Sequence, residues 1–134
     1  MKLLMLAATL CLAGCATHQF ANPQGTAKNR TGQLLYKEGT RSIVGDLTIS
    51  TRGADQRLEF SKGPGLALMR VQRDATHARF DGPLARLSHT VKLPPSKESR
   101  DAGWLAILDR SVKESSFHLS SGGAQFSVQL APGH

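Results

Sequence analysis

The chain of 134 residues is poor in aromatic side chains and in cysteine. It contains one Trp, one Tyr and five Phe, so a hydrophobic core must be built mainly from Leu, Val, Ile and Ala. Both cysteines, Cys11 and Cys15, lie in the first fifteen residues. Residues 16–134 therefore offer no thiol, which excludes disulfides, zinc–cysteine sites and cysteine catalysis in that part of the chain.

Short motifs of common enzymes and nucleotide-binding proteins are also missing. The sequence has no HxH or HExxH pair, no GxSxG, no P-loop and no GxGxxG. Its five histidines are dispersed along the chain, so the pattern predicts no metal site. Several acidic residues fall at positions expected to face solvent, namely Asp46, Glu59, Asp81 and Asp109. We therefore expect a protein that is not an enzyme and needs no cofactor.

The sequence has one long apolar run, and it is too short to span a membrane. Met1 and Lys2 give a positive start, and Leu3 to Ala13 are apolar except for Thr9. Eleven residues match the apolar part of a secretory signal peptide, whereas a membrane-spanning helix needs about 20. The first fourteen residues are thus predicted to be a signal peptide that is removed from the mature protein.

The end of this segment, Leu12-Ala13-Gly14-Cys15, resembles the lipobox of bacterial lipoprotein precursors. The resemblance implies that a diacylglyceryl group is attached to the Cys15 thiol. A peptidase that recognises Leu12, Ala13 and Gly14 then cleaves before Cys15, and the new amine is acylated. Two or three acyl chains of the palmitate type hold a protein firmly, since each buried methylene contributes about 0.8 kcal/mol. The alternative is an ordinary signal peptide with an incidental cysteine.

The residue after the cysteine bears on the location of the mature protein. It is Ala16 rather than Asp. By the sorting rule of enteric lipoproteins, the resemblance then implies the outer membrane, with the domain facing the periplasm.

The chain as a whole carries a net positive charge. There are 17 Lys and Arg against 10 Asp and Glu, a formal charge of +7, and removal of Lys2 with residues 1–14 leaves 16 against 10, or +6. This excess favours acidic partners in the cell envelope, such as anionic lipid, lipopolysaccharide or an acidic envelope protein. Nucleic acid is not expected at a secreted address. The alternative is a solvated basic surface.

Residues 15–32 are rich in Asn, Gln, Gly, Thr, Lys and Arg and show no apolar period. This composition predicts a flexible, lipidated tether, followed by a single domain over residues 33–134. Within the domain, residues 33–36 are expected to be a short first strand or the lead-in to one.

From Ser42 onward, apolar residues recur at every second position, which is typical of half-buried antiparallel strands. The predicted strands cover residues 42–50, 56–62, 66–73, 76–81 and 85–93. The residues expected to face inward are Ile43, Leu47, Ile49, Leu58, Phe60, Ala78, Phe80, Leu87 and Val91. Turn-forming residues separate the strands at 51–55, 63–65, 74–75 and 82–83.

A helix near residues 97–113 follows the Pro94-Pro95 pair. Ser96 or Ser99 is a candidate N-cap, with acidic residues in the first turn and basic residues in the last. The predicted apolar stripe consists of Trp104, Leu105, Leu108 and Val112, with Ile107 at its margin. A hairpin then closes the chain, with Phe117, Leu119, Phe126, Val128 and Leu130 alternating around a turn at Gly122-Gly123. The predicted fold class is α+β: a curved antiparallel meander, one covering helix and a C-terminal hairpin.

Basic side chains gather on three consecutive predicted strands. Arg70, Arg73, Arg79 and Arg86, with His89 nearby, are candidates for an anion-binding stripe. Alternation distributes them over both faces of a sheet, so a solvated face remains the competing interpretation.

The pattern from Ser42 to Leu93, under one covering helix, is similar to that of the Lol lipoprotein-sorting proteins. These fold as a curved half-barrel lined with apolar residues that holds acyl chains. We expect a non-catalytic envelope lipoprotein that binds an acyl ligand or another envelope component. Alternatives are a structural or assembly partner of an envelope complex, and a hydrolase of envelope glycans or lipids. A concave aliphatic cavity would favour the carrier and a filled core the structural role. A hydrolase would need converging titratable groups, such as His89 or His118 with a carboxylate.

Overall fold

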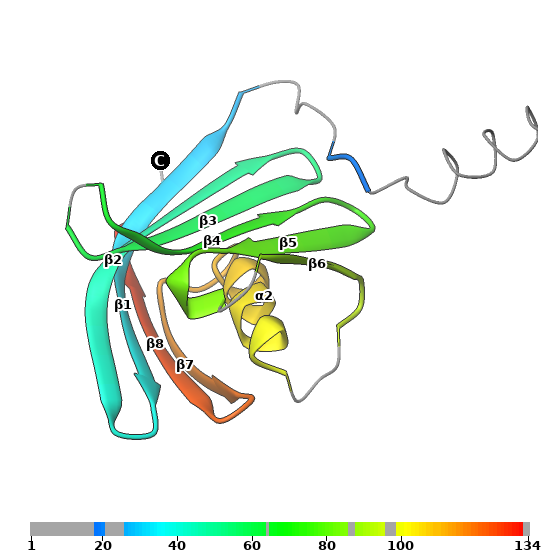
Figure 1. The fold of residues 1–134 in the computed structure, drawn as a ribbon. Helices are drawn as coiled ribbons and strands as arrows, with labels where there is room; N and C mark the ends of the chain where they lie inside the picture. The colour runs from blue at the N-terminus through cyan, green and yellow to red at the C-terminus, as the bar shows by residue number, and fades with distance from the viewer. Residues whose placement is uncertain (1–17, 21–25, 64, 86–87, 96–98, 133–134) are drawn as a thin grey trace, which may run out of the picture.

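Eight antiparallel strands form one curved sheet around the helix α2 in the computed structural model (Figure 1). The structure describes residues 18–20, 26–63, 65–85, 88–95 and 99–132. The elements, in chain order, are β1 (Lys28–Glu38), β2 (Arg41–Arg52), β3 (Asp55–Ser61), β4 (Ala67–Arg73), β5 (His77–Asp81), the 3₁₀ turn η1 (Pro83–Ala85), β6 (His89–Lys92), α2 (Arg100–Arg110), β7 (Ser116–Ser121) and β8 (Ala124–Leu130). The predicted fold class is confirmed.

The strand order is β6-β5-β4-β3-β2-β1-β8-β7. Strands β1 to β6 follow one another as a meander, whereas the C-terminal hairpin returns to pair with the first strand. In that pairing Gly32 lies opposite Leu130 and Glu38 lies opposite Ala124. The terminal hairpin is therefore an integral part of the sheet, and it closes the concave side next to α2 (Figure 1).

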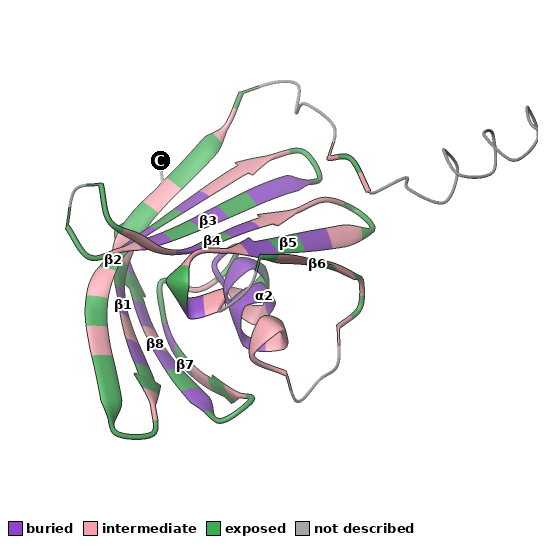
Figure 2. Cartoon of the chain, in the orientation of Figure 1, coloured by how far each residue is buried: buried purple, intermediate pink, exposed green. Residues whose placement is uncertain are grey.

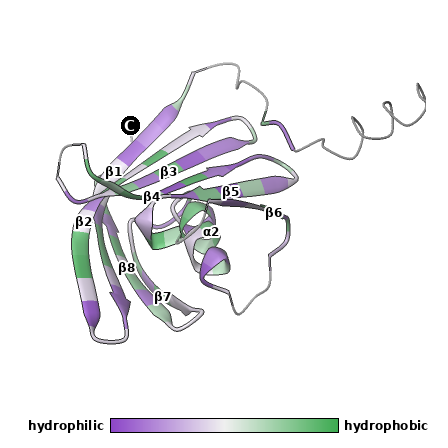
Figure 3. Cartoon of the chain, viewed as in Figure 1, coloured by the Kyte–Doolittle hydropathy of each residue, from purple (hydrophilic) through white to green (hydrophobic). Residues whose placement is uncertain are grey.

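Buried and exposed residues alternate along most of the strands, as the period-two pattern predicted (Figure 2), and the buried ones form the core with residues of α2. Apolar and polar residues alternate in the same way (Figure 3). In β2, Leu47 and Ile49 are buried, while Asp46 and Thr48 are exposed. Other inward residues that the sequence predicted and the structure buries are Leu58, Phe60, Ala78, Phe80, Phe117, Phe126, Val128 and Leu130. Leu87 lies outside the described residues.

Helix α2 begins where the sequence offered a capping residue. Ser99 is the N-cap, and its hydroxyl accepts a hydrogen bond from the Ala102 N–H at 3.2 Å. Asp101 lies in the first turn and Arg110 in the last, which complements the helix dipole.

The predicted apolar stripe of this helix needs two corrections. Val112 is 67% exposed because the helix ends at Arg110 and Ser111 caps it, so residue 112 no longer follows the helical period. Ile107 is fully buried rather than marginal. The curved sheet surrounds the helix more widely than a one-sided stripe implies, so a broader arc of its surface is covered.

Close backbone packing at two glycines lets the layers meet. A Cβ atom on Gly103 of α2 would lie 2.6 Å from Cε2 of Phe126, and one on Gly45 of β2 would lie 2.5 Å from the carbonyl oxygen of Ser61. Both positions require a residue without a side chain. At Gly103 this lets the helix contact the sheet, and at Gly45 it lets neighbouring strands contact each other.

The first strand is much longer than the predicted strand at residues 33–36. Strand β1 begins at Lys28 and pairs with β2 from Lys28 opposite Thr51 to Glu38 opposite Arg41. The prediction that residues 28–32 belong to a flexible tether is therefore wrong. These five residues carry no apolar side chain, so alternation could not reveal a strand held by main-chain pairing and by Arg30.

Arg30 ties the start of β1 to the ends of two other elements. Its guanidinium donates to the carbonyl oxygens of Ser111, Glu114 (3.1 Å) and Ala131 (3.2 Å), and to the Ser115 hydroxyl (2.8 Å). The planar fork of arginine supplies donors in several directions, which lysine could not match. The guanidinium group of Arg30 thus links the segment after α2 to the residue that follows β8.

The predicted strand over residues 85–93 is also shortened. Residues Pro83–Ala85 form η1, and β6 begins only at His89, where it pairs with β5. Residues 86–87 and 96–98 lie outside the described residues, and so does the other candidate cap, Ser96. Within the described part of the chain, no helix is both long enough and apolar enough to cross a bilayer.

Candidate functional site

A shallow hollow of about 550 Å³ lies on the solvent side of β2 to β5, opposite the face that packs on α2. Strand register lays polar side chains across it in two rows. The first row is Thr48, Glu59, Arg70 and Asp81. The second row is Ser50, Arg57, Gln72 and Arg79.

Charges of both signs alternate in this hollow. The guanidinium Nε of Arg70 lies 3.9 Å from Oε1 of Glu59, and both side chains are at least half exposed. Three arginines face two carboxylates, so the lining carries one net positive charge. Such exposed pairs contribute about 0 to 1 kcal/mol each, which leaves their guanidinium groups available to a ligand.

Asp81 is held at one corner of the hollow. Its Oδ1 accepts hydrogen bonds from the Ser88 hydroxyl at 2.5 Å and from the Gly82 N–H at 3.0 Å. These bonds, first that of Ser88 and then that of Gly82, lower the pKa of Asp81 below its usual range, and Arg79 and Arg70 add to the effect.

The structure separates the arginines of the predicted anion-binding stripe. Arg70 and Arg79 share the hollow, but Arg73 points to the other side of the sheet. There it donates to the side-chain oxygen of Gln56 and lies 2.8 Å from Oδ1 of Asp109 on α2. Arg73 has the same parity as the buried residues of β4, so a set drawn from both parities could not lie on one face. Arg86 lies outside the described residues.

Arg57 is the third arginine of the hollow, and the sequence analysis did not include it among the anion-binding candidates. It lies on the exposed face of β3, with its Nε 3.2 Å from Oδ1 of Asp55. Alternation around the inward residue Leu58 is consistent with this outward position of Arg57. Only the strand register, which sets Arg57 opposite Gln72 and Gln72 opposite Arg79, places Arg57 and Arg79 in the same row of the hollow. Neighbours across strands cannot be derived from the pattern of one strand.

A second hollow, of about 420 Å³, opens between the sheet and the start of α2. His89 and Asp101 meet there, with Nε2 and Oδ2 at 2.9 Å, and the His89 ring stacks on Phe80 at 5.2 Å. Apolar walls come from Met69, Leu84 and Trp104. The mouth also carries the charged side chain of Arg100 and the polar side chain of Ser99.

His118, the other histidine considered for catalysis, lies elsewhere. It is exposed on β7, and its Nδ1 lies 2.8 Å from the Ser127 hydroxyl. His134 is outside the described residues, as are Cys15 and the lipobox residues Leu12, Ala13 and Gly14. Of the two histidines named for catalysis, His89 meets a carboxylate, that of Asp101, whereas the partner of the His118 ring is the Ser127 hydroxyl.

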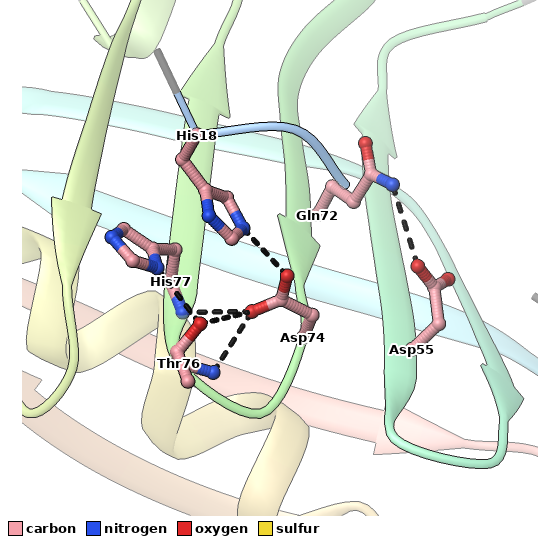
Figure 4. A network of polar contacts seen from close by, with 6 residues as sticks. All are labelled: His18, Asp55, Gln72, Asp74, Thr76 and His77. Atoms are coloured by element: carbon pink, nitrogen blue, oxygen red, sulfur yellow. Dashed lines mark hydrogen bonds and ion pairs between the residues drawn. The ribbon is translucent and has the colours of Figure 1, made fainter. Parts of the chain in front are cut away.

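Folding also brings His18, Asp74 and His77 together at the turn between β4 and β5 (Figure 4). Nε2 of His18 lies 2.6 Å from Oδ2 of Asp74, and the His18 ring stacks on His77 with centroids 3.7 Å apart and planes inclined by 16°. His18 also meets Phe20 edge to face at 4.7 Å. Because His18 and Asp74 are 56 positions apart, sequence spacing gave no sign of this cluster.

The Asp74 carboxylate is strongly hydrogen bonded. Burial alone would raise its pKa, but bonds from the N–H groups of Thr76 (2.9 Å) and His77 (2.8 Å), together with His18, outweigh burial. The pKa of Asp74 is thereby lowered to about 2. The Thr76 hydroxyl lies 2.8 Å from Nδ1 of His77 and joins the same network (Figure 4).

No protein-family model matches this chain, and a comparison with curated proteins finds no match.

Proposed function

We propose that this chain is a non-catalytic bacterial envelope lipoprotein that binds another envelope component. In this proposal the domain is held through lipid on Cys15, in the outer membrane and facing the periplasm. The sequence Leu12-Ala13-Gly14-Cys15, after a short positive start and an eleven-residue apolar run, supports the anchor. The excess of basic residues supports an acidic partner.

The observation that carries the choice between a carrier and a binding partner is that, beyond the hollow at the start of α2, aromatic side chains fill the space between α2 and the sheet. Trp104 is 1% exposed and packs against the rings of Tyr36 (5.6 Å), Phe60 (6.0 Å) and Phe126 (5.0 Å). All four rings are essentially buried, so the position where a half-barrel carrier would hold acyl chains is occupied by the protein's own side chains. The polar mouth at His89 and Asp101 does not suit a hydrocarbon chain.

The solvent face of β2 to β5 offers a surface for the acidic partner. Arg57, Arg70 and Arg79 present guanidinium groups that can pair with phosphate or carboxylate oxygens. The carboxylates of Glu59 and Asp81 in the same hollow repel anionic groups that approach them, which favours a partner whose anionic groups meet the guanidinium groups. Anionic lipid, lipopolysaccharide and an acidic envelope protein all carry groups of the required kind.

The anchor is tested by the substitution Cys15→Ser. We expect the wild-type chain to incorporate labelled palmitate in a bacterial host and to sediment with the outer membrane. The variant should remain a longer precursor without label. Label that persists in Cys15→Ser would show that the lipid is attached elsewhere and would overturn the proposal.

A hydrolase of envelope glycans or lipids is the second candidate, and the His89–Asp101 pair is the observation that favours it. A carboxylate that orients an imidazole is a recurring part of general acid–base sites. Hydrolysis of an envelope polymer by the purified chain, lost in His89→Ala but kept in His118→Ala, would support this candidate over the first. We expect neither the wild-type chain nor the variants to show hydrolysis.

A further inference from the structure

We propose that His18, Asp74 and His77 bind a divalent transition-metal ion of the zinc class, which fastens the N-terminal segment to the turn between β4 and β5. The three side chains come from two distant parts of the chain. One ligand atom from each lies within 4.8 Å of the other two.

Their spacing is close to that of a coordinated metal. Zinc binds imidazole nitrogen and carboxylate oxygen at about 2.0–2.2 Å, so ligand atoms of a tetrahedral site lie about 3.4 Å apart. Nε2 of His18 and Oδ2 of Asp74 are 2.6 Å apart, a hydrogen-bond distance, and the third ligand atom lies within 4.8 Å of both. To bind one ion, the first two atoms must separate slightly and the side chains must rotate so that all three atoms face it.

The donor set selects the class of ion. Two imidazoles and one carboxylate suit Zn²⁺, Cu²⁺ and Ni²⁺, whereas Ca²⁺ and Mg²⁺ prefer sites made wholly of oxygen. The His18 and Asp74 side chains are each 22% exposed, so the cluster is sheltered but open to an incoming ion and to water as a fourth ligand.

The surroundings orient the carboxylate as in known metal sites. Oδ1 of Asp74 accepts from the N–H groups of Thr76 and His77 and from the Thr76 hydroxyl at 3.3 Å. These bonds fix the carboxylate and leave Oδ2 directed at His18 (Figure 4).

Metal binding requires the stacked rings of His18 and His77 to rotate. The lone pairs of two parallel imidazoles lie in the ring planes and do not point to a common ion.

The consequence concerns the orientation of the domain at the membrane. His18 follows Cys15 by three positions, with two residues between them, a reach of at most about 11 Å when extended. If Cys15 is lipidated, as proposed above, a metal at His18 holds the β4–β5 turn close to the bilayer. Metal binding itself does not depend on lipidation, so the two proposals are tested separately.

The test is calorimetric titration of ZnCl₂ into the full chain purified in detergent. We expect one site per chain. His18→Ala and His77→Ala should each weaken it by more than about tenfold, the lower end of the loss caused even by outer-shell partners. The matched control is His118→Ala, an exposed histidine bonded to Ser127 on the other end of the sheet, which should bind zinc as the wild type does.

A second measurement guards against variants that fail to fold. Circular dichroism should give the same spectrum for all four proteins, and zinc should raise the thermal midpoint of the wild type and of His118→Ala only. Equal zinc affinity in wild type and His18→Ala, or loss of the site in His118→Ala, would overturn the proposal. So would a wild-type chain that binds no zinc, whatever the outcome of lipid labelling.

Discussion

At the scale of single residues, Tyr36 is a direct probe of the packed interior because it is the chain's one tyrosine. It is 1% exposed, and its hydroxyl donates to Oε2 of Glu38 at 3.0 Å. Arg100 of α2 donates to the same oxygen at 2.7 Å. Burial raises the pKa of Tyr36, and the bond to Glu38 raises it further, although Arg100 acts in the opposite direction.

We therefore predict that Tyr36 ionises in the folded protein above pH 10, about the pKa of a free tyrosine. A raised pKa favours the protonated form, so its contribution to stability is complete below pH 10 and is lost as the pH rises through the folded value. Ultraviolet absorbance of the phenolate measures the titration. Glu38→Gln should move it to lower pH, whereas an ordinary midpoint near pH 10 in the native protein would contradict the packing described.

For the substitution Gly103→Ala, the packing predicts a loss of stability, whereas helix propensity alone predicts a gain. In an exposed helix, Gly→Ala stabilises by about 1 kcal/mol. Here the new Cβ would lie 2.6 Å from Cε2 of the buried Phe126, and overpacking of this kind costs about 1–3 kcal/mol. We expect a net loss of stability for Gly103→Ala in urea unfolding. The loss should shrink when Phe126→Leu makes room, and a stabilised single variant would show that α2 does not press on β8.

At the scale of elements, alternation predicted the meander well because each strand is buried on one face. Phe60 and Phe80, for example, are separated from the next inward residue by one exposed position. The same rule failed where the inward positions carry no apolar side chain or where the element has already ended. The first half of β1 has no apolar residue, and Val112 follows a helix that has already ended. These boundaries depend on contacts with distant elements, which local patterns do not contain.

Arg30 tests how the first half of β1 is held. We predict that Arg30→Met destabilises the protein by about 2 kcal/mol, because several carbonyl oxygens near the ends of α2 and β8 lose a charged donor. Hydrogen exchange should rise in residues 28–32 more than in β3. Arg41→Gln, an exposed change at the start of β2, is the matched control and should stay within about 0.5 kcal/mol of the wild type. Equal effects of the two substitutions on stability would show that the hydrogen bonds of Arg30 do not hold the first half of β1 in place.

At the scale of the whole molecule, the sequence predicted the fold class but not the sites. Arg70 and Arg79 were identified because they lie on consecutive predicted strands, but Arg57 joined them only through strand register. The cluster of His18, Asp74 and His77 was missed entirely. Sites made by several strands depend on tertiary pairing, whereas a half-buried sheet leaves its period in every strand.

The filled interior makes a further prediction about ligands. A fluorescent fatty acid should show no saturable one-to-one binding to the purified chain, because Trp104 and the rings around it occupy the concave side of the sheet. Trp104→Ala opens space for a hydrocarbon chain and is the matched comparison, provided that it folds. Stoichiometric binding by the wild type would instead favour an acyl carrier of the Lol type.

The anchor is the premise on which location and partners depend, and mass spectrometry of the mature N-terminal peptide tests it most directly. We expect a peptide that begins at Cys15 and carries a diacylglyceryl group on the thiol with an acyl group on the amine. A peptide that begins at another residue, or an unmodified Cys15, would contradict it.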